Sequence, residues 1–298
     1  MTMRRDVEFD SHGVTCRAWF YRPDDPSGDP PVIVMAHGLG AVRRMRLDAF
    51  AERFTAAGYA CLVFDYRHFG DSDGTPRGLL SIRRQLADWT AALAYARTLP
   101  GVDTARIVLW GTSFGGGHVL VTGARHPEVA AVVAQCPFTS GPASTLALDR
   151  LGAFKVTMRG LADLASAALR RPPVRVGLAG SGHEAALMSA PDAQPGYLGL
   201  IPPGLEFTNS VAARVGLAIP LYVPARSVRR LQVPTLICAC DADSVAPVGP
   251  TVAAAEGNPM VTLRRYPDGH FDIYVGDAFE RVVTDQIEFL TETVPLGR

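Results

Sequence analysis

Gly111-Thr112-Ser113-Phe114-Gly115 directly follows the apolar run Ile107-Val108-Leu109-Trp110 and precedes a stretch that is compatible with a helix. Strand, sharp turn and helix form the context in which a G-x-S-x-G sequence presents a catalytic serine. A serine hydroxyl is a poor nucleophile at neutral pH, so it must stand clear of the backbone and next to a base. The flanking glycines keep side chains away from the crossing strand and helix. The pattern predicts Ser113 as a nucleophile; the alternative is a plain turn between a strand and a helix.

Short apolar runs alternate with helical patterns on both sides of this turn. We expect an N-terminal hairpin over residues 7–21, turned at His12-Gly13. Buried strands are predicted over residues 32–36, 60–64, 107–110, 129–134, 234–240 and 261–266, with helices over 47–57, 82–97, 113–125 and 278–293. Uninterrupted β-rich runs separated by helices indicate an α/β fold, in which helices cover both faces of a mostly parallel sheet.

This rhythm breaks between residues 138 and 230, where no clear strand is recognisable and helix-like stretches cover about 143–151 and 161–169. We therefore expect residues 1–137 and 231–298 to form one α/β core, and residues 138–230 to form an inserted, mainly helical cap. Such an insert would lie over the serine at the carboxyl edge of the sheet, where open α/β sheets bind ligands. Its predicted pocket residues are Phe138, Tyr197, Phe207 and Tyr222.

Acyl transfer also needs a base beside the nucleophile and an anion that orients the base. His270 follows the strand over 261–266, and it comes after the serine and the candidate acids in the chain order typical of this architecture. Asp241 and Asp243 both follow the strand over 234–240. We predict Asp243 as the orienting acid, because the turn up to Pro247 can present its carboxylate to His270; Asp241 is the alternative acid.

An oxyanion hole completes the predicted site. Backbone N–H groups supply such a hole without any side chain. His37-Gly38-Leu39-Gly40 follows the strand over 32–36, so its loop can bring amides over Ser113. We expect the N–H groups of Leu39 and Phe114 to be the donors and His37 to be a structural partner of the loop.

Charge and cysteine content limit the partners. Lys plus Arg equals Asp plus Glu at 29 each, so no net field attracts nucleic acid or an anionic membrane. The chain has no apolar leader and no run of about 18 apolar residues, which favours a cytoplasmic protein. Cys238-x-Cys240 lacks a second pair at zinc-site spacing, and the Asp71-Ser72-Asp73-Gly74 segment is interpreted as a capped turn. We expect no cofactor, no metal, a small acyl substrate, and a monomer or homodimer.

The insert is rich in arginine. Its basic residues are Arg159, Arg170, Arg171, Arg175, Arg226, Arg229 and Arg230. These residues either form a solvated surface or attract an acidic substrate.

The whole chain resembles the α/β-hydrolase superfamily. The resemblance rests on His37 to Val42, Phe64 to Gly74, Gly111 to Gly116 and Asp243 to Pro247. Residues 32–137 resemble bacterial hydrolases related to X-prolyl dipeptidyl aminopeptidases and acetylxylan-esterase-like enzymes. The resemblance implies the fold but leaves the substrate open, since one scaffold hosts esterases, thioesterases, amidases and acyltransferases. Some similar proteins of polyketide pathways act on thioesters.

These observations favour a serine hydrolase that cleaves an ester or thioester of a small to medium acyl group through an acyl-Ser113 intermediate. An acyltransferase or biosynthetic thioesterase would use the same triad. A ligand-binding protein without turnover and, more weakly, a peptidase are further alternatives.

Overall fold

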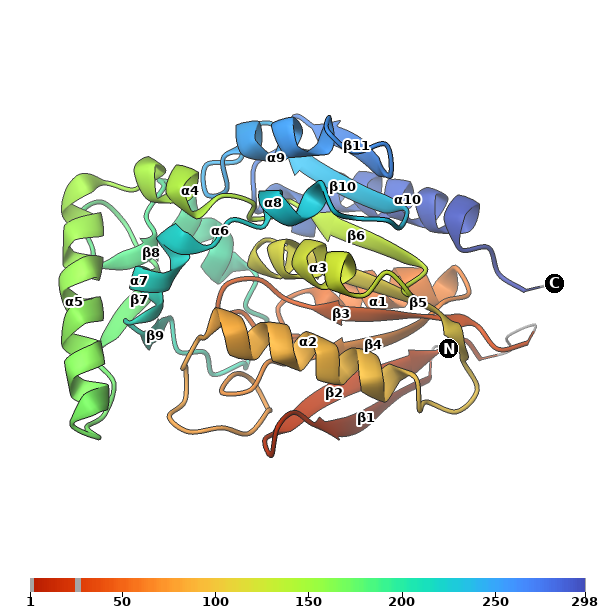
Figure 1. Ribbon diagram of the computed structural model, residues 1–298, viewed down its shortest axis with the longest axis horizontal. Coiled ribbons are helices and arrows are strands. Elements are labelled where there is room, and N and C mark those ends of the chain that lie inside the picture. Colours follow the sequence, from red (N-terminus) through yellow and green to blue (C-terminus); the bar gives the residue numbers. More distant parts are fainter. Residues whose placement is uncertain (1–2, 25–27, 298) are drawn as a thin grey trace.

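The computed structural model describes residues 3–24 and 28–297. Its central sheet has eight strands in the order β1-β2-β4-β3-β5-β6-β10-β11 (Figure 1). These strands are β1 (Met3–Asp10), β2 (Thr15–Arg22), β3 (Pro31–Ala36), β4 (Ala60–Phe64), β5 (Asp103–Thr112), β6 (Ala131–Gln135), β10 (Thr235–Cys240) and β11 (Val261–Tyr266). β2 pairs antiparallel with β1 and β4, and all the other neighbours are parallel. The predicted mostly parallel sheet is confirmed.

Helices cover both faces of this sheet, as Figure 1 shows. They are α1 (Leu47–Ala56), α2 (Ile82–Ala96), α3 (Phe114–Arg125), α9 (Val248–Ala255) and α10 (Gly276–Thr293). α1 contacts α10 on one face, while α2 contacts α3 on the other. The sequence patterns missed α9. None of the helices in the described part of the chain combines the length and the apolar character that crossing a membrane requires.

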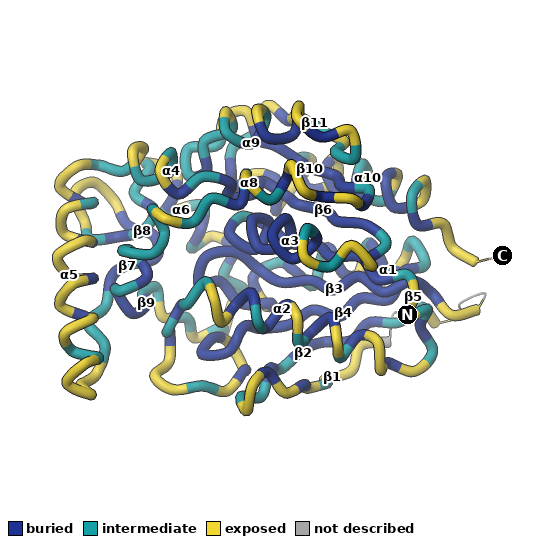
Figure 2. The backbone as a smooth tube through the Cα atoms, viewed as in Figure 1, coloured by how far each residue is buried: buried dark blue, intermediate teal, exposed yellow. Residues whose placement is uncertain are grey.

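The strands are buried along nearly their whole length in the middle of the sheet (Figure 2). Their apolar runs have no polar alternation because both faces are covered. Trp110 of β5 packs against Phe50 of α1, and its indole N–H donates to Gln286 of α10. On the other face, Trp89 of α2 packs against Phe64 of β4. One aromatic layer on each side thus fixes the helices to the sheet that carries Ser113.

The segment between β6 and β10 differs from the expectation of a region without strands. It contains a three-stranded sheet in the order β8-β7-β9, made of β7 (Arg175–Ala179), β8 (Ala186–Met188) and β9 (Ser210–Ala212). Its helices are α4 (Gly141–Ala147), α5 (Arg150–Ala168), α6 (Ala193–Gly199), α7 (Val215–Ala218), η1 (Ile219–Leu221) and α8 (Ala225–Val228). Strands of three to five residues rich in Gly and Ala leave no detectable alternation in the sequence, so the prediction was wrong here.

The helix boundaries of this segment were also wrong. Asp149 is an N-cap whose carboxylate accepts a hydrogen bond from the Gly152 N–H at 2.8 Å. A capped helix begins there and continues without a break to Ala168, whereas the pattern placed one helix across residue 149 and another from residue 161.

A buried ion pair ties α2 to the loop after β4. Asp88 lies 2.6 Å from an Arg67 nitrogen, and the two side chains are 0% and 7% exposed. Arg67 also donates to the Ser11 hydroxyl at 2.5 Å. Burying two charges is tolerated here because each has its partner, and loss of one partner leaves the other charge without compensation.

We expect Asp88→Ala to lower the free energy of unfolding by about 3–5 kcal/mol, because Arg67 would stay buried as an unpaired cation. Glu128→Ala is the matched control: its carboxylate pairs with Arg97 on the surface and is 47% exposed, so its loss should cost less than about 1 kcal/mol. Urea unfolding of both variants measures the difference. Equal losses of unfolding free energy in the two variants would contradict the stabilising role of the buried ion pair between Asp88 and Arg67.

Candidate active site

Ser113 occupies a strained turn between β5 and α3. Its backbone has φ 56° and ψ −119°, a conformation that few non-glycine residues adopt. A Cβ at position 111 would lie 2.3 Å from the Gly115 carbonyl oxygen, and a Cβ at position 115 would lie 2.4 Å from that of His37. The two glycines of the motif are therefore required by close backbone contacts.

The structure brings Ser113, His270 and Asp243 together. When the imidazole is neutral, the Ser113 hydroxyl donates to His270 Nε2 over 2.9 Å, and His270 Nδ1–H donates to Asp243 Oδ2 over 2.6 Å. This tautomer follows from Asp243, whose carboxylate can only accept. The three residues follow the ends of β5, β10 and β11; β10 and β11 are neighbours in the sheet, and β6 lies between β5 and β10. Their catalytic roles stay predictions.

Asp243 is held by its own turn. Its Oδ1 accepts from the N–H groups of Val245 and Ala246 at 2.9 and 2.6 Å, which leaves Oδ2 for His270. Asp241, the alternative acid, is directed elsewhere: its Oδ1 lies 2.8 Å from Arg265 Nε, and its side chain is 40% exposed. Of the two candidate acids, only Asp243 contacts the imidazole.

The pKa values of two buried histidines near Ser113 are shifted in opposite directions. Burial opposes the protonation of His270, but the carboxylate of Asp243 and the Cys136 sulfur outweigh it and hold the His270 pKa well above 6.5. Burial lowers the pKa of His37 to about 4. The Gly38 N–H donates to His37 Nδ1, and His37 Nε2–H donates to the Met45 carbonyl. His37 is thus a neutral brace of the loop after β3.

That loop lies directly against the serine. A Cβ at position 38 would be 2.7 Å from Ser113 Cβ and 3.1 Å from Ser113 Oγ. Within the described chain, the N–H groups of Leu39 and Phe114 donate to no acceptor. Their role as oxyanion donors stays a prediction, and these free amides are compatible with it. The Tyr197 hydroxyl donates to the Leu39 carbonyl at 2.8 Å and anchors the loop from the insert.

A cavity of about 50 Å³ adjoins Ser113. Its apolar lining residues include Leu39, Phe114, Phe138, Leu148, Leu187, Met188, Ile219 and Val245. The insert supplies several of these walls, among them α4 and the segment after β8. The cavity is therefore lined mainly by apolar side chains, with hydroxyl groups supplied by Ser113, Ser144, Thr145, Ser189 and Ser244.

Only Phe138 of the four predicted pocket residues lines this cavity. Tyr197 is held behind Leu39, and Phe207 packs against Tyr197 with ring centroids 5.9 Å apart. The Tyr222 ring packs on Phe114 and Phe138, while its hydroxyl lies 2.7 Å from His118 Nδ1. The expectation is corrected for these three aromatic residues: they form the layer behind the lining.

Sequence reasoning missed the support that Tyr274 gives the site. Tyr274 stacks on His37 with ring planes 1° apart, and its hydroxyl forms a hydrogen bond with Thr112. It belongs to η2 (Asp272–Tyr274), a short turn whose position is set by the tertiary structure. No cluster of three His, Cys, Asp or Glu residues that could hold a metal ion occurs in the part of the chain that the structure describes.

Comparison with known proteins found a family model described as serine aminopeptidase, S33, that matches residues 30–186, more than half of the chain. The quorum-quenching protein AidA of Acinetobacter baumannii (strain MDR-ZJ06) is 55% identical over 291 residues, which cover 98% of this chain and 95% of that protein. A thiohydrolase of Eupenicillium brefeldianum is 32% identical over 58% of this chain and 54% of its own length. The polyketide transferase grgF of Penicillium sp is 35% identical over 45% of each chain.

Solved structures resemble the whole molecule. DcsB in complex with its substrate analogue has a TM-score of 0.84 at 26% identity, covering 98% of this chain and all of that chain. The α/β-hydrolase GrgF from Penicillium sp. sh18 has a TM-score of 0.81 at 24% identity, covering 98% and 99% of the two chains.

The raised pKa of His270 predicts a pH dependence. A protonated imidazole cannot accept the Ser113 proton, so the rate at which a fluorophosphonate labels Ser113 should rise with pH, with a midpoint above 6.5. In Asp243→Asn, burial acts on His270 without the opposing charge of the carboxylate, so the midpoint should move down while the plateau rate falls by about 10⁴-fold. A midpoint that is unchanged in Asp243→Asn would contradict the effect of the Asp243 carboxylate on the His270 pKa.

The contact between Gly38 and Ser113 gives a second prediction. A methyl group at position 38 must displace the serine or the loop, and small displacements at a reacting centre cost about 10²-fold in rate. Gly38→Ala should therefore slow labelling by that factor. Gly249→Ala is the control, because a Cβ there meets no atom within 4 Å and the labelling rate should not change.

Proposed function

The chain belongs to the serine aminopeptidase S33 family and has the α/β-hydrolase fold, and from that premise we propose that it cleaves a carboxylic ester or thioester through an acyl-Ser113 intermediate. The predicted superfamily is confirmed, while the narrower resemblance to X-prolyl aminopeptidases and acetylxylan esterases stays a prediction. One observation carries the proposed mechanism: an unbroken hydrogen-bonded series from Asp243 through His270 to Ser113.

In this mechanism the Ser113 oxygen attacks the acyl carbon as its proton moves to His270 Nε2. The carbonyl oxygen becomes an oxyanion that accepts hydrogen bonds from the N–H groups of Leu39 and Phe114. Collapse of this intermediate breaks the bond to the leaving alcohol or thiol, which takes the proton from His270. Water then attacks the acyl carbon while its proton moves to His270 Nε2. Collapse of the second intermediate returns this proton to the Ser113 oxygen and releases the carboxylic acid.

The cavity supports an apolar acyl group as the part of the substrate that enters it. At about 50 Å³ it accommodates a short acyl chain without rearrangement. A longer chain requires outward movement of α4, whose Ser144, Thr145 and Ala147 form one wall. The proposal therefore covers small acyl groups directly and medium ones through displacement of the insert.

The similar proteins support this chemical class. One is a thiohydrolase, and another is a quorum-quenching protein that covers almost the whole chain. A cyclic ester would be opened by the same attack, so lactones belong with linear esters and thioesters as candidate substrates. Transfer of the acyl group to an alcohol, amine or thiol is the second candidate, favoured by the apolar cavity and by the similarity to a polyketide transferase.

Intact-mass measurement after reaction with a fluorophosphonate tests the proposal. We expect a single adduct that disappears in Ser113→Ala and persists in Ser144→Ala, a matched change at another serine of the same cavity. Turnover of a panel of p-nitrophenyl esters, acyl thioesters and acylated lactones, with and without a competing alcohol or thiol, then separates hydrolysis from transfer. A folded protein that forms no adduct would exclude the acyl-serine mechanism and favour a ligand-binding protein.

A further inference from the structure

A wide groove lies outside the candidate active site, between α2, the end of α3 and residues 214–230 of the insert. Its volume is about 1010 Å³. Its basic lining residues are Arg83, Arg84, Arg125, Arg214, Arg226, Arg230 and His12. No Asp or Glu occurs among the lining residues within the described chain. In a protein with equal numbers of cationic and anionic residues, this is a strong local excess of one sign.

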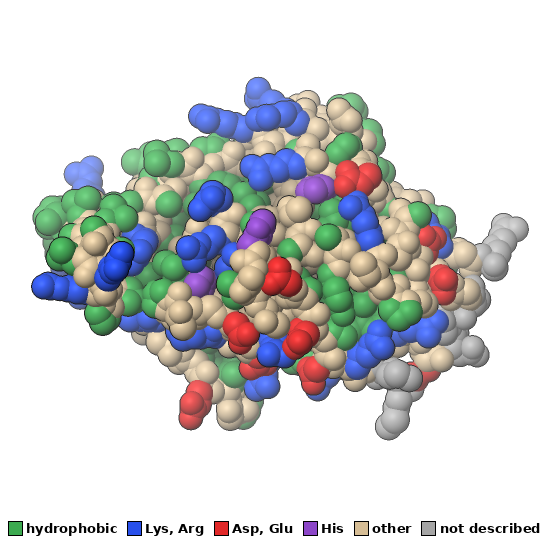
Figure 3. All heavy atoms as spheres, turned by 60° about the horizontal axis from the view of Figure 1, so that its bottom comes forward, with side chains coloured by type: hydrophobic (Ala, Val, Ile, Leu, Met, Phe, Trp, Pro, Cys, Tyr) green, Lys and Arg blue, Asp and Glu red, His purple; other side chains and the backbone are tan. Residues whose placement is uncertain are grey.

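Five of these six arginines have no anionic partner among the described residues. Arg214 pairs with the buried carboxylate of Asp163, and Arg84 lies 3.0 Å from His68 Nε2. The other four, Arg83, Arg125, Arg226 and Arg230, form no ion pair with any residue that the structure describes, and all four are exposed. In Figure 3, basic side chains gather on the face that carries α2 and the adjoining insert.

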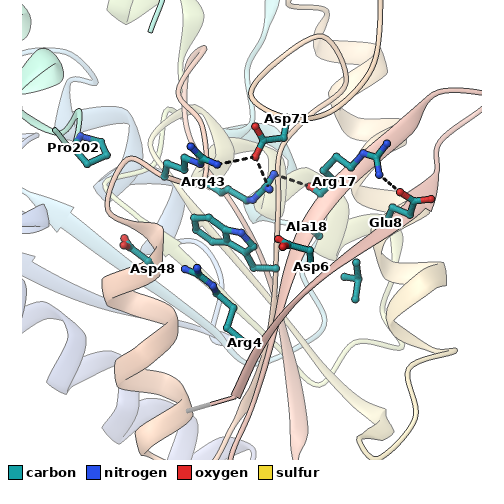
Figure 4. Close-up of a pocket in the computed structure, with 12 residues that line it drawn as sticks. Arg4, Asp6, Glu8, Arg17, Ala18, Arg43, Asp48, Asp71 and Pro202 are labelled. Carbon is teal, nitrogen blue, oxygen red and sulfur yellow. Dashed lines mark hydrogen bonds and ion pairs between the residues drawn. The ribbon is translucent and has the colours of Figure 1, made fainter. Parts of the chain in front are cut away.

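A second charged hollow of the same molecule shows the contrast. It has a volume of about 710 Å³, and Figure 4 shows ion pairs between arginines and carboxylates that line it. Arg43 lies 2.7 Å from Asp71, and Arg17 pairs with Glu8. There the charges are compensated within the chain. In the groove beside α2 the compensating anions are missing and must come from solvent or from a partner.

The shape of the groove distinguishes a protein partner from a small anion. Small anions are held by donors that converge on one point, such as the backbone N–H groups of a nest. Here the free guanidinium groups are spread over α2, α3 and the insert. The groove also has apolar walls, and Leu221 stands beside them with 82% of its surface exposed. Apolar contact flanked by several cations suits a helix that carries a stripe of leucines between carboxylates.

We propose that this groove docks an acidic amphipathic helix of a partner protein, with Leu221 in the apolar contact and Arg226 and Arg230 paired with its carboxylates. The inference goes beyond the proposed function and holds whether or not Ser113 is acylated. The groove has one physical connection to the cavity: Tyr222 lines the groove, and its ring packs on Phe114 with centroids 5.5 Å apart.

Fluorescence titration of a labelled protein tests the docking site. The five native cysteines are buried, so Ser227→Cys, which lines the groove and leaves Leu221, Arg226 and Arg230 in place, accepts an environment-sensitive dye at one position. The probe is a synthetic helical peptide with a leucine stripe flanked by glutamates, and its control carries glutamine at every glutamate. We expect saturable binding of the acidic peptide only. Leu169→Cys, at a site that is 62% exposed near the end of α5, should report no binding.

Charge reversal separates the groove from general attraction. Arg226→Glu/Arg230→Glu should weaken peptide binding at least tenfold, whereas Arg150→Glu/Arg171→Glu changes the net charge equally outside the groove and should weaken it less than twofold. Raising the NaCl concentration from 50 to 300 mM should weaken binding of the acidic peptide at least tenfold in the protein that retains Arg226 and Arg230.

Three outcomes would overturn the proposal: equal weakening in the two double variants, absence of peptide binding, or displacement of the peptide by micromolar inorganic pyrophosphate, which would assign the groove to small anions. All measurements are repeated in a Ser113→Ala background. Binding that persists there separates this inference from the outcome of the acyl-enzyme test.

Discussion

The left-handed backbone of Ser113 depends on three places where main chains approach too closely for any side chain. Gly111 faces the carbonyl of Gly115, Gly115 faces that of His37, and Gly38 faces Ser113 itself. Together these contacts hold β5, α3 and the loop after β3 at one point of the sheet edge. The strain at Ser113 persists because its neighbours leave no alternative path for the chain. Every other part of the candidate site is positioned relative to that point.

His37 and His270 carry the same side chain, and their surroundings in the folded protein give them different roles. His37 and His270 are both buried, yet one pKa falls to about 4 and the other is held well above 6.5. The difference arises from their partners: a carbonyl and an amide for His37, and a carboxylate for His270. A neutral His37 keeps the loop in place at any pH at which His270 changes its charge.

The sequence was informative where a pattern is local and strong. The core strands are continuous apolar runs, and the order Ser113, Asp243, His270 along the chain indicated which residues would meet. The insert was predicted poorly, because its strands are short and its aromatic residues include tyrosines whose hydroxyls find partners behind the cavity lining, as Tyr197 and Tyr222 do. No pattern in one dimension reveals that Arg83 and Arg125 of the core meet Arg226 and Arg230 of the insert.

The strand order also determines how the molecule forms during synthesis. β6 pairs on one side with β5 and on the other with β10, which is made only after roughly a hundred further residues. At 5–20 residues per second this interval lasts about 5–20 s. Throughout it β6 is an open sheet edge with unpaired backbone groups, the kind of edge that templates aggregation. This edge acquires its partner only when β10 has been made and pairs with β6.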